Sequence, residues 1–246
     1  MSVKQIDVVL SPCEELPEAD SWLVIDILRA TTTMDAFFSG GGKTLYPCPS
    51  IEDAFALRER LAAEGESPLL MGERNALPPP GFDLGNSPLE LLEYGPAKSP
   101  AAVMATTNGT SALLKAARSG RPVRPACARN ARAAVMAAAS DGDTVGVLCA
   151  GLRGRAALDD AVCAGLFVEI LLGSRRAELG DGAKMVLDLW RSAPRMEERL
   201  KESVHGRRLI DLGFEDDLVF AAAVNSSETL SLFGWTESGY PVIRRA

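Results

Sequence analysis

The stretch VIDILRATTT, residues 24–33, carries a short apolar run directly into polar residues and then into a helical pattern. Its β-branched residues are typical of a buried strand. Asp26 lies at the end of that run, and Arg29 and three threonines, Thr31, Thr32 and Thr33, follow. An ionised carboxylate at the end of an apolar strand is costly unless it is paired or bound to a cation. The stretch therefore predicts a strand-to-helix junction with a functional aspartate.

Two further segments repeat this arrangement, MATTNGTSALLKAA at 104–117 and VGVLCAGLRGRAALDDAVCAG at 145–165. In a doubly wound sheet such junctions gather at the carboxyl ends of the strands, where ligands bind. The free N–H groups and partial positive charge of a helix N-terminus attract an anion. Each junction alone is also explained by ordinary caps and turns. Three together favour an anion site, with donors from Thr31, Thr32, Thr33, Thr107, Asn108, Gly109, Thr110 and Gly151.

Apolar runs alternate with helical patterns along the first two thirds of the chain. The runs lie at 6–10, 22–28, 44–48, 68–72, 101–105 and 144–150. This βαβ rhythm predicts an α/β fold with a mostly parallel or mixed sheet layered by helices on both faces. Ser50 with Asp53, and Ser87 before Pro88, are typical of helix N-termini.

The last third of the sequence has a different pattern. Beyond about Gly180 it turns helical, at 196–204 and 215–224, and it ends in a predicted hairpin around 237–239. We expect one compact unit over 1–246, or two tightly packed halves of about 1–178 and 179–246.

Composition narrows the class of protein. The net charge of -7 over 246 residues argues against a nucleic-acid partner, which would need clustered Lys and Arg. Five cysteines, an odd number without paired metal spacing, favour reduced thiols in the cytoplasm. Pro12 interrupts the first apolar run, so we expect neither a signal peptide nor a membrane span. The one histidine, His205, is expected to mark a helix end rather than to act as a catalytic base.

Three acidic positions are candidates for the chemistry. Asp26 is either the partner of Arg29 or a Mg²⁺ ligand. Asp159 and Asp160 suit the first turn of a helix, where the dipole favours acidic side chains. Neighbouring side chains on a helix point in different directions, so we expect Asp160 to face the sheet and Asp159 to face solvent.

Several motifs follow one another along the sequence: VIDILRATTT, GER at 72–74, GFDLGNSP at 81–88, TTNGT at 106–110, and CAG at 149–151 with a downstream acidic pair and a second CAG at 163–165. Together, from Val24 to Gly165, they resemble the 2-phosphosulfolactate phosphatase family. The resemblance implies a cytosolic, Mg²⁺-dependent phosphatase on an α/β fold. Its substrates would be phosphate esters of 2-hydroxy acids such as 2-phosphosulfolactate, in coenzyme M biosynthesis. Leu152, Ala156, Ala157 and Asp159 depart from the usual pattern and bear on substrate identity.

The resemblance and the residues together suggest roles. Asp26, Glu73 and Asp160 are the expected Mg²⁺ ligands, because this hard cation prefers carboxylates and water. Arg29 and Arg74 would bind the oxygens of a small-molecule phosphate ester, and the Thr and Asn-Gly-Thr segments with Asn86 would hold the rest. A metal-bound or carboxylate-activated water would then attack phosphorus.

Alternatives stay open at this point. Cys149 and Arg155 have the C-x5-R spacing of cysteine phosphatases, and a thiol before a helix N-terminus would have a lowered pKa. Asp26 could itself be the nucleophile, as in aspartyl-phosphate enzymes. The chain could also bind an organophosphate without turning it over. A homodimer through the C-terminal third is possible, and no membrane partner is expected.

Overall fold

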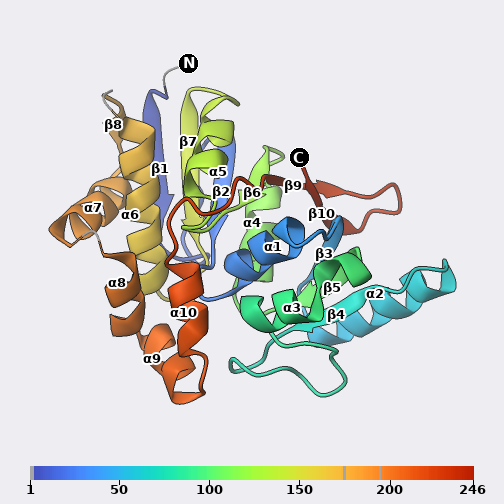
Figure 1. The fold of residues 1–246 in the computed structure, drawn as a ribbon. Helices are drawn as coiled ribbons and strands as arrows, with labels where there is room; N and C mark the ends of the chain where they lie inside the picture. The colour runs from blue at the N-terminus through green and yellow to red at the C-terminus, as the bar shows by residue number, and fades with distance from the viewer. Residues whose placement is uncertain (1–2, 174–175, 194) are drawn as a thin grey trace.

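The predicted strands form two five-stranded sheets in the computed structural model, which describes residues 3–173, 176–193 and 195–246 (Figure 1). The first sheet has the order β6-β2-β7-β1-β8, and every neighbouring pair in it is parallel. Its strands are β1 (Gln5–Val9), β2 (Ser21–Ile25), β6 (Val123–Pro125), β7 (Thr144–Cys149) and β8 (Glu178–Leu179).

The second sheet has the order β4-β5-β3-β10-β9. Its first three strands are parallel, whereas β10 runs antiparallel to both β3 and β9. The strands are β3 (Thr44–Cys48), β4 (Leu69–Gly72), β5 (Ala101–Ala105), β9 (Ser231–Trp235) and β10 (Pro241–Arg245). The α/β class with parallel and mixed strands is confirmed, but the strands divide between two sheets where the sequence pattern suggested one.

Helices cover both faces of each sheet, as predicted. Between the sheets lie α1 (Ala30–Ser39) and α4 (Gly109–Ala117), packed on a shared core that includes Trp22, Phe37 and Phe38. The outer face of the first sheet packs against α5 (Ala131–Ala139), α6 (Leu158–Leu172) and α7 (Asp181–Ser192). The outer face of the second packs against α2 (Ile51–Ala63). The carboxyl ends of β2, β4, β5 and β7 all lead into the region between the sheets.

Both predicted helix starts are confirmed. Ser50 Oγ accepts a hydrogen bond from the N–H of Asp53 at 3.0 Å at the start of α2. Ser87 Oγ accepts one from the N–H of Glu90 at 3.2 Å at the start of α3 (Pro88–Tyr94), which has Pro88 at its first position. A short 3₁₀ helix follows at Pro96–Lys98.

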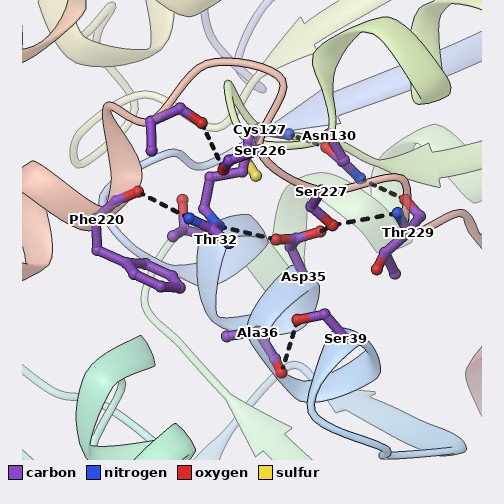
Figure 2. Close-up of polar contacts among 12 residues, drawn as sticks. Thr32, Asp35, Ala36, Ser39, Cys127, Asn130, Phe220, Ser226, Ser227 and Thr229 are labelled. Atoms are coloured by element: carbon purple, nitrogen blue, oxygen red, sulfur yellow. Dashed lines mark hydrogen bonds and ion pairs between the residues drawn. The ribbon is translucent and has the colours of Figure 1, made fainter.

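The C-terminal third contains α8 (Met196–Glu202), α9 (Val204–Asp211), α10 (Glu215–Ala221) and the predicted hairpin β9–β10. The segment between α10 and β9 is fastened to the middle of the molecule by polar side chains (Figure 2). Asp35 of α1 accepts hydrogen bonds from Ser227 Oγ at 2.7 Å and Arg129 Nε at 3.0 Å. Asn130 Nδ2 donates to the carbonyl of Thr229 at 3.0 Å. The C-terminal segment is thus tied to α1, and the division of the chain near residue 178 stays a prediction.

In the described part of the chain, no helix combines the length and the apolar character that crossing a bilayer would require.

Candidate active site

Residues that directly follow four strands line one polar cavity between the two sheets. Asp26 follows β2, Glu73 follows β4, Asn108 comes three residues after β5, and Arg153 comes four residues after β7. The outer cavity encloses about 170 Å³ and is lined by Glu73, Asn75, Ala76, Thr107, Asn108, Leu152, Arg153, Val204, His205 and Arg208. A narrower floor beneath it is lined by Asp26, Leu28, Arg29, Glu73, Ala76, Asn86, Asn108 and His205.

Asp26 lies at the floor and is nearly buried, with 6% of its surface exposed. Its carboxylate accepts only a long hydrogen bond of 3.4 Å from the N–H of Ala30 at the start of α1. Burial raises the pKa of Asp26 to about 6, opposed by His205 and assisted by the nearby carboxylates of Glu73 and Asp159. Asp26 is therefore a carboxylate that can take up a proton near neutral pH.

The start of α4 approaches Asp26 so closely that position 109 must be glycine. A Cβ on Gly109 would lie 2.7 Å from Asp26 Oδ2 and 2.5 Å from the Cβ of Ala30. Neither neighbour can yield, because both belong to buried residues. Gly109 therefore serves the site by its small size, whereas the sequence had suggested an anion donor.

Glu73 is held rigidly by backbone groups at the side of the cavity. Its Oε1 accepts a hydrogen bond from the N–H of Thr107 at 2.7 Å, and its Oε2 accepts one from the N–H of Ala76 at 2.9 Å. Burial tends to raise the pKa of Glu73, but these hydrogen bonds to its charged form outweigh it and leave the pKa below its ordinary value. Glu73 is thus a fixed negative charge facing the cavity.

His205, which sequence reasoning took for a helix-end marker, lines both the cavity and its floor. It is the second residue of α9, and its side chain is 17% exposed. Its Nδ1 lies 3.5 Å from Oδ2 of Asp159, whose side chain is 3% exposed. Burial opposes charging of the imidazole, but Asp159, with Asp26 and Glu73 further away, outweighs it and raises the pKa of His205.

Two arginines at the mouth supply positive charge. Arg208 Nη2 donates to the carbonyl of Asn75 at 2.9 Å, and Arg153 Nη2 lies 3.3 Å from Asn75 Oδ1. The N–H of Arg153 donates to Asn108 Oδ1 at 3.3 Å. Arg153 and Arg208 are both exposed, so their guanidinium groups can meet an anion that enters from solvent. Sequence reasoning missed both residues.

Arg29 does not pair with Asp26, nor is its guanidinium free for substrate. Its Nη1 donates to Asp217 Oδ2 at 2.7 Å, its Nη2 donates to the carbonyl of Ala76 at 2.8 Å, and its guanidinium carbon lies 4.4 Å from the ring centre of Phe214. Both side chains of the Arg29–Asp217 pair are 2% exposed. The predicted role of Arg29 is therefore corrected: it joins α1 to α10 beneath the floor.

The three threonines are also structural. Thr31 Oγ1 donates to the carbonyl of Asp26 at 3.0 Å, Thr32 Oγ1 to the carbonyl of Ile27 at 2.8 Å, and Thr33 Oγ1 to the carbonyl of Asn86 at 2.9 Å. All three are buried and none lines the cavity. Their hydroxyl groups satisfy backbone carbonyls at the junction, so the expected contact with phosphate is not supported.

Of the remaining predicted binding residues, the structure brings Asn86, Thr107 and Asn108 to the cavity or its floor. Thr110 is buried and bonds to the Thr106 carbonyl at 3.1 Å. Arg74 Nη1 donates to the carbonyl of Glu73 at 3.1 Å and does not line the cavity. The segment 72–88, which carries the GER and GFDLGNSP motifs, thus contributes Glu73, Ala76 and Asn86 rather than Arg74.

Asp160 faces inward, as predicted, but its carboxylate is occupied. Oδ1 accepts a hydrogen bond from the N–H of Ile27 at 3.0 Å, and Oδ2 accepts one from the N–H of Gly151 at 2.8 Å. Burial, with the charges of Asp159 and Asp26, raises the pKa of Asp160 well above its ordinary value. Asp160 therefore fastens two strand ends together, and the expectation that Asp159 faces solvent is wrong, since Asp159 is buried as well.

The cysteine alternative fails on burial. Cys149 is the last residue of β7, fully buried, and burial together with the Asp160 and Asp159 carboxylates raises the pKa of its thiol well above the ordinary value. The expected lowering of its pKa is therefore wrong. Arg155 is exposed, and it does not line the cavity. No thiolate nucleophile is provided here.

Across residues 3–173, 176–193 and 195–246, no group of three or more His, Cys, Asp and Glu side chains is arranged to hold a metal ion. The expected trio is not assembled, because Asp26 and Glu73 line the floor and Asp160 does not. Two buried acceptors near the floor, Asn86 Oδ1 and Asp159 Oδ1, have no hydrogen-bond partner within that part of the chain. The hard oxygen donors at the floor are thus Asp26, Glu73 and Asn86.

Comparison with known proteins agrees with this geometry. The profile of the family described as 2-phosphosulpholactate phosphatase matches residues 10–234. A protein of Thermus thermophilus named probable 2-phosphosulfolactate phosphatase is 41% identical over 91% of each chain. Proteins of the same name from Deinococcus radiodurans and Carboxydothermus hydrogenoformans are 39% identical over 86% of each chain and 37% identical over 90% of each chain. The chain therefore belongs to the 2-phosphosulpholactate phosphatase family.

Proposed function

We propose that this protein hydrolyses phosphate monoesters of 2-hydroxy carboxylic acids, with 2-phosphosulfolactate as the first candidate. The observation that carries the proposal is the meeting of Asp26, Glu73, His205, Arg153 and Arg208 in one cavity at the ends of four strands. A site that pairs acidic groups at its floor with arginines at its mouth suits an ester with several negative charges.

The ester would be recognised by residues at the mouth of the cavity. A 2-hydroxy acid phosphate carries a carboxylate beside the phosphate, and 2-phosphosulfolactate adds a sulfonate. Arg153 and Arg208 can bind such oxygens with charge-assisted hydrogen bonds, in a protein whose net charge of -7 would otherwise repel them. The side chains of Thr107 and Asn108 add neutral polar groups. A substrate with a single anionic group would use only part of this arrangement.

A Mg²⁺ ion fits the floor by the chemistry of its donors. Asp26, Glu73 and the unpartnered Asn86 Oδ1 are hard oxygen ligands, and Mg²⁺ commonly takes one or two carboxylates and keeps several waters. When bound, the ion would neutralise phosphoryl charge and lower the pKa of water. Asp160 is left out of this set, because it does not line the floor.

Within that arrangement we assign the proton of the attacking water to Asp26. Its carboxylate lies at the floor and, among the described residues, accepts one long hydrogen bond, so one oxygen can bind the ion while the other takes the proton. An ionised carboxylate in that position can accept a proton during attack. Asp26 as a direct nucleophile remains the second route, and acid quenching during turnover with ³²P-labelled substrate separates the two, because only that route leaves label on the protein.

The proposal is tested by phosphate release from three esters: 2-phosphosulfolactate, 2-phospholactate and isopropyl phosphate, which lacks a second acid group. We expect turnover with Mg²⁺, loss of turnover in EDTA, and kcat/KM falling in that order. Binding of the esters without phosphate release would indicate an organophosphate-binding protein. Equal rates on all three would contradict the proposed role of the mouth.

The proposed setting is a reducing cytoplasm, where sulfolactate would be an intermediate of coenzyme M biosynthesis. All five cysteines are free thiols, which supports a reducing compartment. A homodimer through the C-terminal third remains a prediction that a measurement of solution mass can test.

A further inference from the structure

We propose that His205 is the general acid of the reaction, donating a proton from Nε2 to the oxygen of the leaving alcohol, and that Asp159 is the positioning residue that orients it. The inference rests on the phosphatase function proposed above and adds a residue to that site.

The first support is the position of His205 on α9. It is one of four residues shared by the cavity and its floor, together with Glu73, Ala76 and Asn108. Of these four, only the imidazole can carry a proton at neutral pH and also give it up. A phosphate ester held between the floor and Arg153 and Arg208 must therefore pass beside His205.

The second support is the buried carboxylate behind the imidazole. Asp159 lies in the first turn of α6, and its Oδ2 is 3.5 Å from Nδ1 of His205. Its Oδ1 has no hydrogen-bond partner among the described residues. A buried carboxylate without a partner is strongly unfavourable, so a protonated imidazole is the counter-charge that the geometry provides. Because the two ring nitrogens lie on opposite sides of the imidazole, placing Nδ1 toward Asp159 turns Nε2 away from it.

Charged groups of both signs surround His205. Asp159 faces it from α6, Asp26 from the end of β2 and Glu73 from the end of β4. On the other side, Arg29, Arg153 and Arg208 share its cavity or floor. Asp26 and Glu73 belong to the proposed Mg²⁺ site, so Asp159, at 3.5 Å, is the carboxylate that remains to hold the proton on the imidazole. A contact of 3.5 Å is long, but such contacts commonly shorten when substrate binds.

The proposed step combines two proton transfers with cleavage of the ester bond. Water attacks phosphorus and gives its proton to Asp26, while the bond between phosphorus and the bridging oxygen breaks and leaves both electrons on that oxygen. The oxygen takes the proton of His205 Nε2 and departs as the neutral alcohol. His205 then recovers a proton from solvent, and Asp26 releases to solvent the proton that it accepted. The alkoxide of a 2-hydroxy acid is a poor leaving group, so this proton is needed most for such esters.

The test compares two esters of nearly equal size and charge in the variant His205→Gln. In 2-phospholactate the leaving group is an alkoxide, whereas in phosphoenolpyruvate it is a more stable enolate. We expect kcat on 2-phospholactate to fall about 10²–10⁴-fold, and kcat on phosphoenolpyruvate to fall at least about tenfold less. Arg207→Gln, an exposed neighbour on the same helix that does not line the cavity, is the matched control and should keep the wild-type rate.

A second readout needs no catalytic comparison. His205 is the sole histidine of the sequence, so the Cε1 proton of its ring gives a single resonance that can be titrated by NMR. We expect a midpoint above the ordinary value in the wild type and a lower midpoint in Asp159→Asn. In the same variant the high-pH limb of kcat should move to lower pH while KM changes little.

The outcomes separate the two proposals. A wild type that releases phosphate from none of the three esters 2-phosphosulfolactate, 2-phospholactate and phosphoenolpyruvate overturns both the phosphatase function and this inference. A wild type that is active, with His205→Gln losing both esters equally or losing neither, overturns only the role of His205. A histidine midpoint that does not move in Asp159→Asn overturns the role of Asp159.

Discussion

Asp26 shows how one residue can serve function at the expense of stability. It is buried at the floor and accepts only one long hydrogen bond, so its ionised form is poorly stabilised in the folded protein. Its pKa is raised from 3.8 to about 6. The folded protein therefore binds this proton more readily than the unfolded chain does. The contribution to stability is complete below pH 4 and is lost as the pH rises through about 6.

We predict that Asp26→Asn stabilises the protein at neutral pH in EDTA. Removing a charge whose pKa is raised by about 2 units should increase the free energy of unfolding by about 3 kcal/mol at pH 7.5. Urea unfolding at pH 7.5 and at pH 4 measures the effect, and the difference from the wild type should vanish at the lower pH. Asp211→Asn, at an exposed position, should change stability by less than about 0.5 kcal/mol. A less stable Asp26→Asn protein at pH 7.5 would contradict the account of this carboxylate.

The cysteines give a second prediction at this scale. Cys13 is exposed and the other four are buried, so iodoacetamide should modify Cys13 alone in the native protein. Mass spectrometry should find one adduct per chain. Cys13→Ser should acquire no adduct and should keep its phosphatase activity after treatment. Rapid loss of activity in Cys13→Ser would revive Cys149 as a nucleophile.

Sequence reasoning reached part of the site at the residue scale. Asp26, Glu73 and Asn108 follow strands, and a strand end is visible in the pattern of apolar residues. His205 and Arg208 could not be found in that way. They lie on α9, a short helix that reaches the cavity only through tertiary packing. The threonines were misplaced for a related reason. A hydroxyl group at a strand end can bind a ligand or the neighbouring backbone, and the sequence does not distinguish the two.

Among the elements, α1, α3 and α10 are joined beneath the floor by three buried side chains. Asp217 of α10 accepts hydrogen bonds from Arg29 Nη1 and from Ser87 Oγ, each at 2.7 Å. Since Ser87 also caps α3, one carboxylate holds the end of the 72–88 loop, the first strand-to-helix junction and the C-terminal helices together. This pairing explains why Arg29 is not available to a substrate.

We predict that Asp217→Asn is strongly destabilising, because it leaves the charge of Arg29 buried without its partner. Losing one member of a buried pair costs about 3–5 kcal/mol, which corresponds to a fall in Tm of about 6–20 °C for a chain of this size. Calorimetry measures the shift. Asp216→Asn, on the exposed side of the same helical turn, is the matched control and should shift Tm by no more than about 2 °C. Similar Tm values for the two variants would contradict the proposed tie.

Element positions were largely visible in the sequence, whereas their pairing was not. The runs at 44–48, 101–105 and 144–150 and the caps Ser50 and Ser87 were predicted from local patterns, which depend on neighbouring residues. The division into two sheets depends on which strands meet, and that is set by α1 and α4 filling the space between them. The short strands β6 and β8, of three and two residues, are too brief to show a period.

At the scale of the whole molecule, the sign of the net charge is opposite to that of the two arginines at the mouth of the cavity. The net charge is -7, yet Arg153 and Arg208 lie together at the entrance of the cavity. We predict that the double variant Arg153→Gln/Arg208→Gln raises KM for 2-phosphosulfolactate more than KM for isopropyl phosphate. Each lost charge-assisted hydrogen bond, at about 1.5–3 kcal/mol, corresponds to a loss of affinity of about 10–100-fold.

Steady-state kinetics at two salt concentrations provides this measurement. Arg155→Gln removes a charge from the same loop outside the cavity and is the matched control, with KM expected to stay near that of the wild type. Equal KM increases in the control and in the double variant would show that general attraction, and not the mouth, governs binding.

The central claim is that the cavity between the two sheets hydrolyses the ester with Asp26 at its floor. Phosphate release from 2-phosphosulfolactate in saturating Mg²⁺, measured for the wild type and for folded Asp26→Asn, tests it most directly. The account predicts turnover by the wild type and a fall in kcat of at least about 10²-fold in the variant. A variant that releases phosphate at nearly the wild-type rate would contradict it.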